Sequence, residues 1–426
     1  MRTFLIVWIG QLASMLGSEM TNFAITIWAW SVTGQATPLS FILFFTQTPK
    51  VIAALFAGVL VDRYDRQKIM QLGDLLAGCS TIAILVLFLS DRLEIWHLYF
   101  TGGVNGLFGF LQGLAYSASL SSIVPEKHYS RAGAFNSVQM SGAYILAPAL
   151  AGSLYPGIGL TGILIIDIVT FMIAISTLSI VRIPQINQNH INRHPSIKQD
   201  LTLGFRYLLK YPSLLAILIF LLFENLIENI NFAILPAMIL ARSGDDPAVW
   251  GRLLTSFGIG GVLGAATIGI WGGPKRRIHG LLIGSAVWKV GLIILSVSQT
   301  MLIKIAAAVT SGFCSPFPDS SNQAIWMSKV EPDIQGRVFA ARDLITQIAI
   351  PLGAAIAGPL ADRFFEPAMK TGGSLARLFG GFFGTEIGAG MALMITLFSS
   401  CGLLLGLGGY AFPFLKNVEE IVLNKE

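Results

Sequence analysis

Long runs of apolar residues, interrupted only by short polar turns, cover most of this chain. Hydrophobic residues make up 54% of the 426 residues and charged residues only 12%, whereas a soluble domain is about one-quarter charged. Runs of this length match the roughly 20 residues that a helix needs to cross a bilayer. Because the bilayer core offers no water to the backbone, we expect an all-α integral membrane protein.

The polar turns divide the chain into twelve expected transmembrane helices, six on each side of a central polar stretch. The expected spans are 4–30, 38–61, 69–90, 95–118, 131–156, 158–181, 213–241, 249–272, 278–297, 301–327, 335–362 and 386–412. This pattern predicts an N-terminal six-helix bundle at 1–182, a cytoplasmic linker at 183–212 and a C-terminal six-helix bundle at 213–426. The Gly-rich segment 363–385 is left open as an outer loop that could hold a re-entrant or surface helix.

The turn at Gly58–Lys68 reads G-V-L-V-D-R-Y-D-R-Q-K and orients the chain. Its three bases favour the cytoplasmic side, and most other lysines and arginines fall on that side when the spans are counted from here. We therefore expect a multi-pass protein of the cell (inner or plasma) membrane, with both termini in the cytoplasm.

The two halves of the chain also repeat each other. A shift of 206 residues places Arg131 on Arg337 and Gly152 on Gly358. Parallel repeats of six helices imply two pseudo-symmetric bundles, with a substrate site at their interface.

The turn after the second span resembles the loop motif G-x-L-x-D-R-x-x-R-x-K of the major facilitator superfamily. The matching residues are Gly58, Leu60, Asp62, Arg63, Arg66 and Lys68. The D-R-Y-D-R run is similar to the branch that contains enterobactin and macrolide exporters. The resemblance implies the major facilitator fold over essentially the whole chain.

The resemblance implies a cytoplasmic gate formed by Gly58, Asp62, Arg63, Arg66 and Lys68. In this gate Asp62 would pair with a helix terminus of the other bundle when the transporter is closed inside. The alternative is a solvated turn that only sets topology.

The family's antiporter pattern in the fifth span appears here in an altered form, A-P-A-L-A-G at 147–152. Pro148 and Gly152 are therefore expected to have a helix-packing role. The family's Arg before Gln112-Gly113 is replaced by Gly109, so a proton mechanism must use other residues.

Three carboxylates within spans are candidates for proton coupling: Glu19 in the first span, and Glu224 and Glu228 in the seventh. Each costs about 2.5–3.5 kcal/mol on insertion scales and so needs a reason. Glu224 and Glu228 are four residues apart and share one helical face. The alternative is neutral, hydrogen-bonded packing polarity.

Further polar residues within spans are candidates to line a cavity. They are Asn22, Asn225, Asn229, Arg342, Asp343 and Asp319. For each of these residues, interhelical packing is the competing interpretation. Lys289 and Lys304 could snorkel or pair with an acid.

Several classes of function are not supported by the sequence. There is no phosphate-binding glycine loop or nucleophile motif, so we expect no enzyme and no catalytic residues. The three cysteines have no ligand spacing, so we expect neither a metal site nor a cofactor. The net charge of +5 is dispersed over short loops, which does not indicate nucleic-acid binding.

The expected function is that of a secondary active transporter working by alternating access. The resemblance implies proton-coupled efflux of a small amphiphilic compound, as in a multidrug antiporter, with a drug-like molecule or a siderophore as substrate. The expected partners are this small molecule, protons and the lipid bilayer, and we expect a monomer. The alternatives are an importer or a lipid-moving protein of the same fold, or a non-transporting membrane receptor or scaffold.

Overall fold

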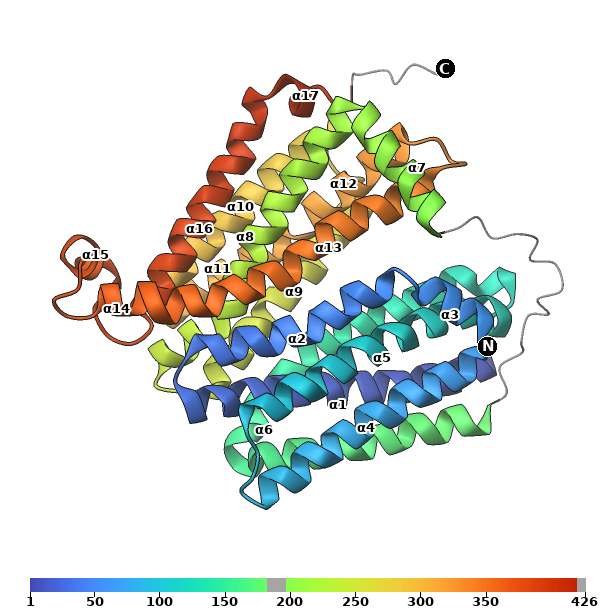
Figure 1. Cartoon of the computed structure of the whole chain (residues 1–426), viewed down its shortest axis with the longest axis horizontal. Helices are drawn as coiled ribbons and strands as arrows, with labels where there is room; N and C mark the ends of the chain where they lie inside the picture. The colour runs from blue at the N-terminus through green and yellow to red at the C-terminus, as the bar shows by residue number, and fades with distance from the viewer. Residues whose placement is uncertain (182–196, 420–426) are drawn as a thin grey trace. The chain divides into compact units, whose positions relative to one another are not determined.

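A computed structural model of the chain describes residues 1–181 and 197–419. Every regular element in these two ranges is helical (Figure 1). By contact, the described residues form two compact units: unit 1 comprises 1–34, 41–181 and 245–255, and unit 2 comprises 35–40, 197–244 and 256–419. Two short segments, 35–40 and 245–255, are therefore grouped apart from their neighbours in sequence.

The first half of the chain supplies most of unit 1. Its elements are α1 (Arg2–Thr33), α2 (Ala36–Ala54), α3 (Ala57–Arg63), α4 (Arg66–Leu89), α5 (Ile95–Ile123), η1 (Glu126–His128) and α6 (Tyr129–Ile180). Within it, α1 packs along α6, and α4 packs on both α5 and α6. A buried cluster of Val7, Val61, Met70, Ala115 and Leu178 joins these helices.

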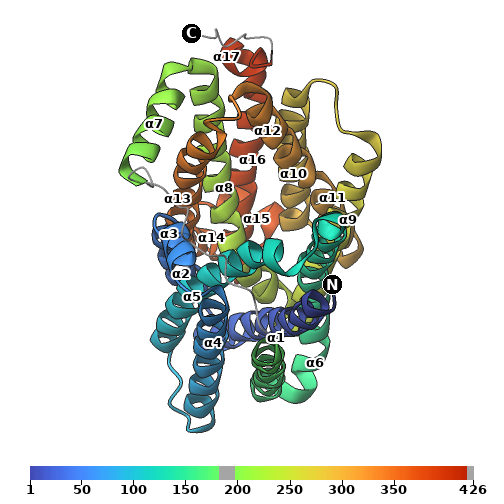
Figure 2. The same ribbon diagram turned by 90° about the vertical axis from the view of Figure 1, so that its right-hand side faces the viewer.

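The second half of the chain supplies most of unit 2. Its longer elements are α7 (Ile197–Lys210), α8 (Pro212–Ser243), α9 (Pro247–Trp271), α10 (Arg277–Val297), α11 (Met301–Cys314), α12 (Pro316–Lys329), α13 (Gln335–Leu360), α15 (Ala376–Phe383) and α16 (Ala389–Gly408). The shorter ones are the π-helical turn η2 (Ala361–Phe365), α14 (Glu366–Met369), η3 (Gly409–Ala411) and α17 (Pro413–Lys416). Within this unit α8 packs between α13 and α16, and α16 also packs on α10 (Figure 2).

Three expected spans differ in detail from the helices observed. The span 38–61 is divided into α2 and α3, because Leu55 and Phe56 form tight three-residue hydrogen bonds to Ile52 and Ala53. The span 301–327 is divided into α11 and α12 at Pro316, which has no N–H to continue the helix. The spans 131–156 and 158–181 run together as α6 and meet at Gly159, whose φ is 61°.

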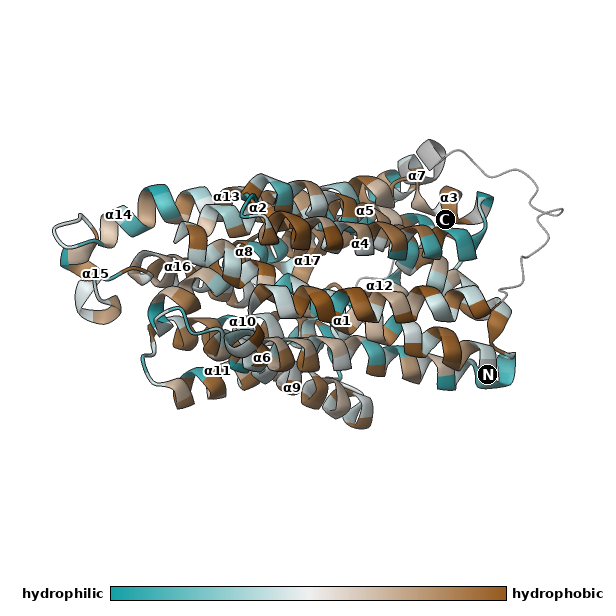
Figure 3. Ribbon diagram, turned by 90° about the horizontal axis from the view of Figure 1, so that it is seen from below, coloured by the Kyte–Doolittle hydropathy of each residue, from teal (hydrophilic) through white to brown (hydrophobic). Residues whose placement is uncertain are grey.

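Among the described residues, nine helical stretches are long and apolar enough to cross a membrane. Hydrophobic residues run along most of the long helices (Figure 3), and large apolar side chains such as Ile180, Ile270 and Leu302 are exposed. An exposed apolar surface of this extent is suited to lipid rather than water.

The structure describes part of the expected linker and the whole of the segment that the sequence left open. Of the expected linker 183–212, residues 183–196 lie outside the described ranges, and most of the remainder forms α7. The segment 363–385 contains the end of η2, then α14 and α15.

Candidate functional site

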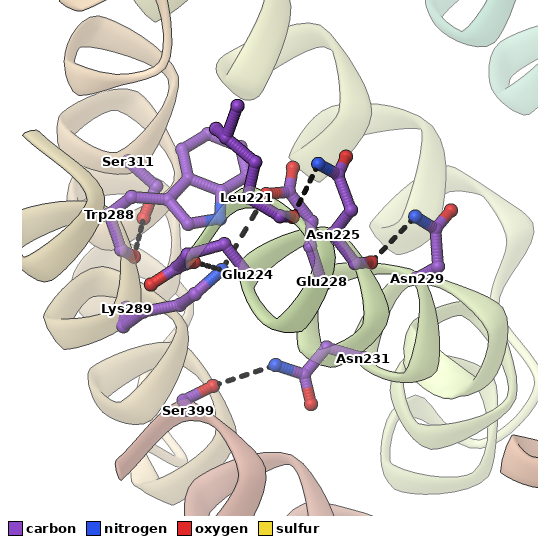
Figure 4. A network of polar contacts seen from close by, with 10 residues as sticks. All are labelled: Leu221, Glu224, Asn225, Glu228, Asn229, Asn231, Trp288, Lys289, Ser311 and Ser399. Atoms are coloured by element: carbon purple, nitrogen blue, oxygen red, sulfur yellow. Dashed lines mark hydrogen bonds and ion pairs between the residues drawn. The ribbon is translucent and has the colours of Figure 1, made fainter. Parts of the chain in front are cut away.

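Two carboxylates on α8 and one ammonium group on α10 form a buried charge cluster in unit 2 (Figure 4). The Nζ of Lys289 lies 3.1 Å from Oε2 of Glu224 and 3.5 Å from Oε2 of Glu228. The Lys289 side chain is fully buried, whereas that of Glu228 is 43% exposed. Their four-residue spacing places both glutamates on one face of α8, and from this face they reach Lys289 on α10.

A glycine on α16 makes room for the lysine. A Cβ on Gly402 would lie 2.8 Å from Cε of Lys289 and 3.2 Å from its Cγ. The aliphatic stem of Lys289 therefore packs directly on the α16 backbone, and its head reaches the two glutamates. A buried ammonium without a partner is strongly unfavourable, so the two glutamates are what permits Lys289 at this depth.

A cavity of about 90 Å³ opens beside the cluster. Its lining residues are Leu221, Glu224, Asn225, Glu228, Leu281, Ser285, Trp288, Lys289, Ser315, Pro318 and Asp319. Asp319, at the start of α12, adds a third carboxylate and is exposed to this space. Three carboxylates and a single ammonium thus face the cavity, and in their ionised forms they carry an excess of negative charge.

Aromatic rings cover one side of the cluster. The Trp288 ring stacks on Phe232 with centroids 6.0 Å apart and planes at 10°, and Phe257 lies 5.9 Å from Trp288. Three buried atoms here have no hydrogen-bond partner among the described residues: Nε1 of Trp288, Oε1 of Glu224 and Nζ of Lys289. The Nζ is held instead by its two ion pairs. Trp288 is thus the aromatic side chain of the cavity lining, and the rings of Phe232 and Phe257 pack against it.

The two predicted asparagines of α8 differ in position. Asn225 lines the cavity, and its Nδ2 donates to the carbonyl of Leu221 at 2.7 Å. Asn229 donates in the same way to the carbonyl of Asn225 and is not among the lining residues.

Arg342 and Asp343 on α13 form a separate cluster in unit 2. Their side chains pair with each other at 2.7 Å, and the Arg342 guanidinium also donates to Oε1 of Gln323. The guanidinium lies over the rings of Trp326 and Phe339, with its centre 5.4 and 4.8 Å from their centroids. Its charge is thus already engaged by an acid and two aromatic faces.

Glu19 and Asn22 lie on α1 in unit 1, three residues apart and therefore about one helical turn from each other. Glu19 is partly exposed and Asn22 is exposed.

Unit 1 also holds two buried aspartates that neutral groups satisfy. Asp74 on α4 accepts from Nε2 of Gln112 at 2.6 Å and from Nε2 of Gln11 at 3.2 Å. Asp167 on α6 accepts from the hydroxyl groups of Ser18, Thr21 and Thr81. Both join neighbouring helices through hydrogen bonds, which agrees with the packing interpretation of buried polarity.

The charged turn between α3 and α4 is held by hydrogen bonds within unit 1. Nη1 of Arg66 donates to the carbonyl of Ala118 at 2.6 Å, and Asp65 caps the N-terminus of α4. Gly58, Arg63 and Lys68 are exposed. The side chain of Asp62 lies outside the described residues, so its expected pairing remains a prediction.

Pro148 and Gly152 lie where α6 meets the first turns of α9, in unit 1. A Cβ on Gly152 would lie 3.2 Å from Cα of Gly251, and one on Gly251 would lie 2.6 Å from the carbonyl oxygen of Pro148. The two predicted packing residues thus occupy a contact in which the two backbones approach closely.

The sequence did not identify Lys289 as the partner of Glu224 and Glu228. The sequence left two possibilities for Lys289, snorkelling or pairing with an acid, and two acids shared one face of another span. The missing information was that α8 and α10 both pack on α16, which brings Lys289 within reach of the two acids.

Comparisons with known proteins agree with this architecture. The chain matches the Major Facilitator Superfamily over residues 7–354. It is 27% identical over 366 residues to macrolide efflux protein A of Streptococcus pyogenes, covering 84% of this chain and 89% of that protein. It is 23% identical over 363 residues to the multidrug efflux pump Tap of Mycolicibacterium fortuitum, covering 82% of this chain and 88% of the pump.

Solved structures show the same fold. The nucleoside transporter NupG superposes with a TM-score of 0.73 at 12% identity, covering 95% of this chain and 99% of that one. A bacterial homologue of the lysosomal transporter Spinster, in an inward-facing and unoccupied conformation, gives 0.69 at 13% identity, covering 98% and 96%. With the family match over most of the chain, these findings establish that the protein belongs to the Major Facilitator Superfamily and is a multi-pass membrane protein and secondary transporter, not an enzyme.

Proposed function

We propose that this transporter exports small, drug-like amphiphilic molecules across the plasma membrane in exchange for protons. The observation that carries the proposal is the cluster of Glu224, Lys289 and Glu228, with Asp319 on the same cavity. Charges inside a membrane-spanning bundle are costly and are typical of ion pathways.

The charge balance of the cluster supports a role for protons. Lys289 neutralises one carboxylate, and the remaining negative charge attracts a proton or another cation. Glu228 is the most accessible of the residues paired with Lys289, since its side chain is 43% exposed. Protonation of Glu228 removes one of the two acids that hold Lys289, so a proton arriving from the cavity changes the forces between α8 and α10.

The substrate class is inferred from relatives and from the lining of the cavity. The relatives are named for efflux of macrolides and of multiple drugs. Leu221, Leu281 and Trp288 give the cavity an apolar part of its lining. Sites of this kind accommodate varied apolar ligands through a few placed polar groups. A cavity of about 90 Å³ holds only part of such a molecule, so most of the substrate must be bound outside it.

The test is direction and coupling in membrane vesicles. Everted vesicles that contain the protein should accumulate a radiolabelled macrolide when the lumen is acidic, and a protonophore should abolish the accumulation. Glu228→Gln should remove the response to the proton gradient, while Glu331→Gln, an exposed acid outside the cluster, should not. Accumulation only in right-side-out vesicles would indicate an importer. Movement of a labelled phospholipid without drug flux would indicate a lipid-moving protein, and no flux of either would favour a receptor or scaffold.

A further inference from the structure

The sequence pattern of the cytoplasmic turn occurs a second time, at the opposite end of α13. Residues 358–363 read G-P-L-A-D-R, and residues 58–63 read G-V-L-V-D-R. The glycine, leucine, aspartate and arginine thus recur at identical spacing. Because α13 begins on the cytoplasmic side predicted for Arg337, this second copy lies at the outer end of the helix.

Asp362 caps a helix that is distant in sequence. Its Oδ1 accepts from the backbone N–H of Ala36 at 3.0 Å, and its Oδ2 accepts from the N–H of Thr37 at 2.7 Å and from the Thr37 hydroxyl at 2.5 Å. The first N–H groups of a helix have no partner within the helix, and the third residue, Pro38, has no N–H. A carboxylate from η2 therefore serves the available donors at the start of α2, where negative charge is favoured.

The glycine of the second copy contacts the same turn. A Cβ on Gly358 would lie 2.1 Å from Oγ of Ser40 and 2.4 Å from Cα of Thr37. A side chain at this position is incompatible with the approach of α2. Gly358 and Asp362 therefore both contact the first turn of α2. The π-helical turn Ala361–Phe365 surrounds Asp362, and such turns are frequent at functional positions in helices.

Gly58, which begins the first copy of the motif, lacks such a contact. A Cβ on Gly58 would meet no atom within 4 Å. Of the two glycines that begin the same motif, one is therefore in tight contact with a helix start and the other faces open space.

We propose that residues 358–363 form an outer latch, in which Asp362 and Gly358 hold the first turn of α2 and must release it during transport. Residues 35–40 belong by contact to unit 2, while the rest of α2 belongs to unit 1. A helix divided in this way cannot follow both units when they move during alternating access. The Asp362 hydrogen bonds are the attachment that must break. The proposal requires a transport cycle and is independent of which ion drives it.

The latch is tested by the accessibility of the turn that it holds. Leu39, which is 6% exposed, is replaced in a Leu39→Cys variant after substitution of the native cysteines Cys79, Cys314 and Cys401. Its labelling by a membrane-impermeant maleimide, added outside intact cells, should become about tenfold faster in Asp362→Ala, as expected for the loss of a helix cap. Gly358→Ala should accelerate labelling similarly.

Matched controls come from sites that lack the contact. Asp91→Asn changes an exposed acid, and Gly336→Ala adds a methyl group on α13 where no atom lies within 4 Å. Both controls should leave the labelling rate unchanged. Equal rates in Asp362→Ala, Gly358→Ala and the controls would overturn the proposal.

Hydrogen exchange provides a second readout that does not depend on a reporter cysteine. In the purified protein, the peptide that contains Ala36 and Thr37 should lose amide protection in Asp362→Ala and keep it in Asp91→Asn. Unchanged protection in Asp362→Ala would contradict the latch. Faster labelling together with transport that ignores a protonophore would leave the latch intact and refute proton coupling instead.

Discussion

The two units solve the problem of buried polarity in different ways. In unit 1, Asp74 joins α1, α4 and α5 through Gln11 and Gln112, and every partner is a neutral amide. In unit 2, Glu224 and Glu228 on α8 meet Lys289 on α10, beside Asp319 on α12. By order along the repeat, these are the first, third and fourth helices of each half. The polar residues on these three helices form a neutral hydrogen-bond network in unit 1. On the corresponding helices of unit 2 they form a charge cluster with more acids than bases.

Under the proposed proton coupling, this difference makes unit 2 the unit in which we expect it. A carboxylate that accepts from two amides is already satisfied and gains little from a change of charge. A cluster with more acids than bases, open to a cavity through Glu228, has a reason to exchange protons. Four substitutions test that contrast.

The largest expected effect is that of Lys289→Met. Removal of one partner from a buried ion pair leaves an uncompensated charge and costs about 3–5 kcal/mol. Thermal unfolding of the purified protein in detergent should show a large fall in Tm, with loss of drug transport. Lys416→Met, at an exposed position, should leave both unchanged. Adding Glu224→Gln to Lys289→Met should restore part of the stability, and no recovery would show that the two residues are not coupled.

The second effect is the loss of coupling in Glu228→Gln. Because this side chain is half-exposed, its ion pair contributes about 0–1 kcal/mol, and Tm should fall little. Drug binding should persist, while uptake by everted vesicles should no longer respond to a proton gradient. A Glu228→Gln protein that still couples would move the proton site to another carboxylate of the cavity, and Asp319→Asn is the next variant to measure.

The third effect is that of Asp74→Asn in unit 1. The amide keeps one acceptor but places an NH2 donor opposite the NH2 of either Gln11 or Gln112. We therefore expect a stability loss of about 1–3 kcal/mol. Coupling to the proton gradient should remain. If this variant keeps its Tm and loses coupling, the contrast between the units is reversed.

The smallest effect is expected for Gly402→Ala on α16. The added methyl group would press on the stem of Lys289, and overpacking of this kind costs about 1–3 kcal/mol, less where a flexible side chain can shift. We expect a small fall in Tm and a changed pH profile of transport. Gly408→Ala, on the same helix with open space around it, is the control. Identical pH profiles in the two variants would show that Gly402 does not position Lys289.

The fold was largely predictable from the sequence, because apolar runs and charged turns are local signals that the bilayer makes decisive. The face shared by Glu224 and Glu228 was predictable for the same reason, since it depends only on helical spacing. The partners were not predictable. Lys289 meets these acids because α8 and α10 both pack on α16, and Asp362 meets Thr37 because the end of α13 lies against the start of α2. The division at Leu55 and Phe56 also escaped prediction, since neither residue is a strong helix breaker.

The contact between α7 and α13 determines where the chain could be cut into two co-expressed halves. A Cβ on Gly204 of α7 would lie 2.4 Å from the carbonyl oxygen of Arg337 and 2.9 Å from Cβ of Ala341, so α7 is seated against α13 without a gap. The segment that reads as a spacer is thus a fitted part of unit 2. Two co-expressed polypeptides separated ahead of Ile197 would keep α7 with its partner. A separation at Tyr211 would detach it from the helix that carries both Arg342 and the outer latch.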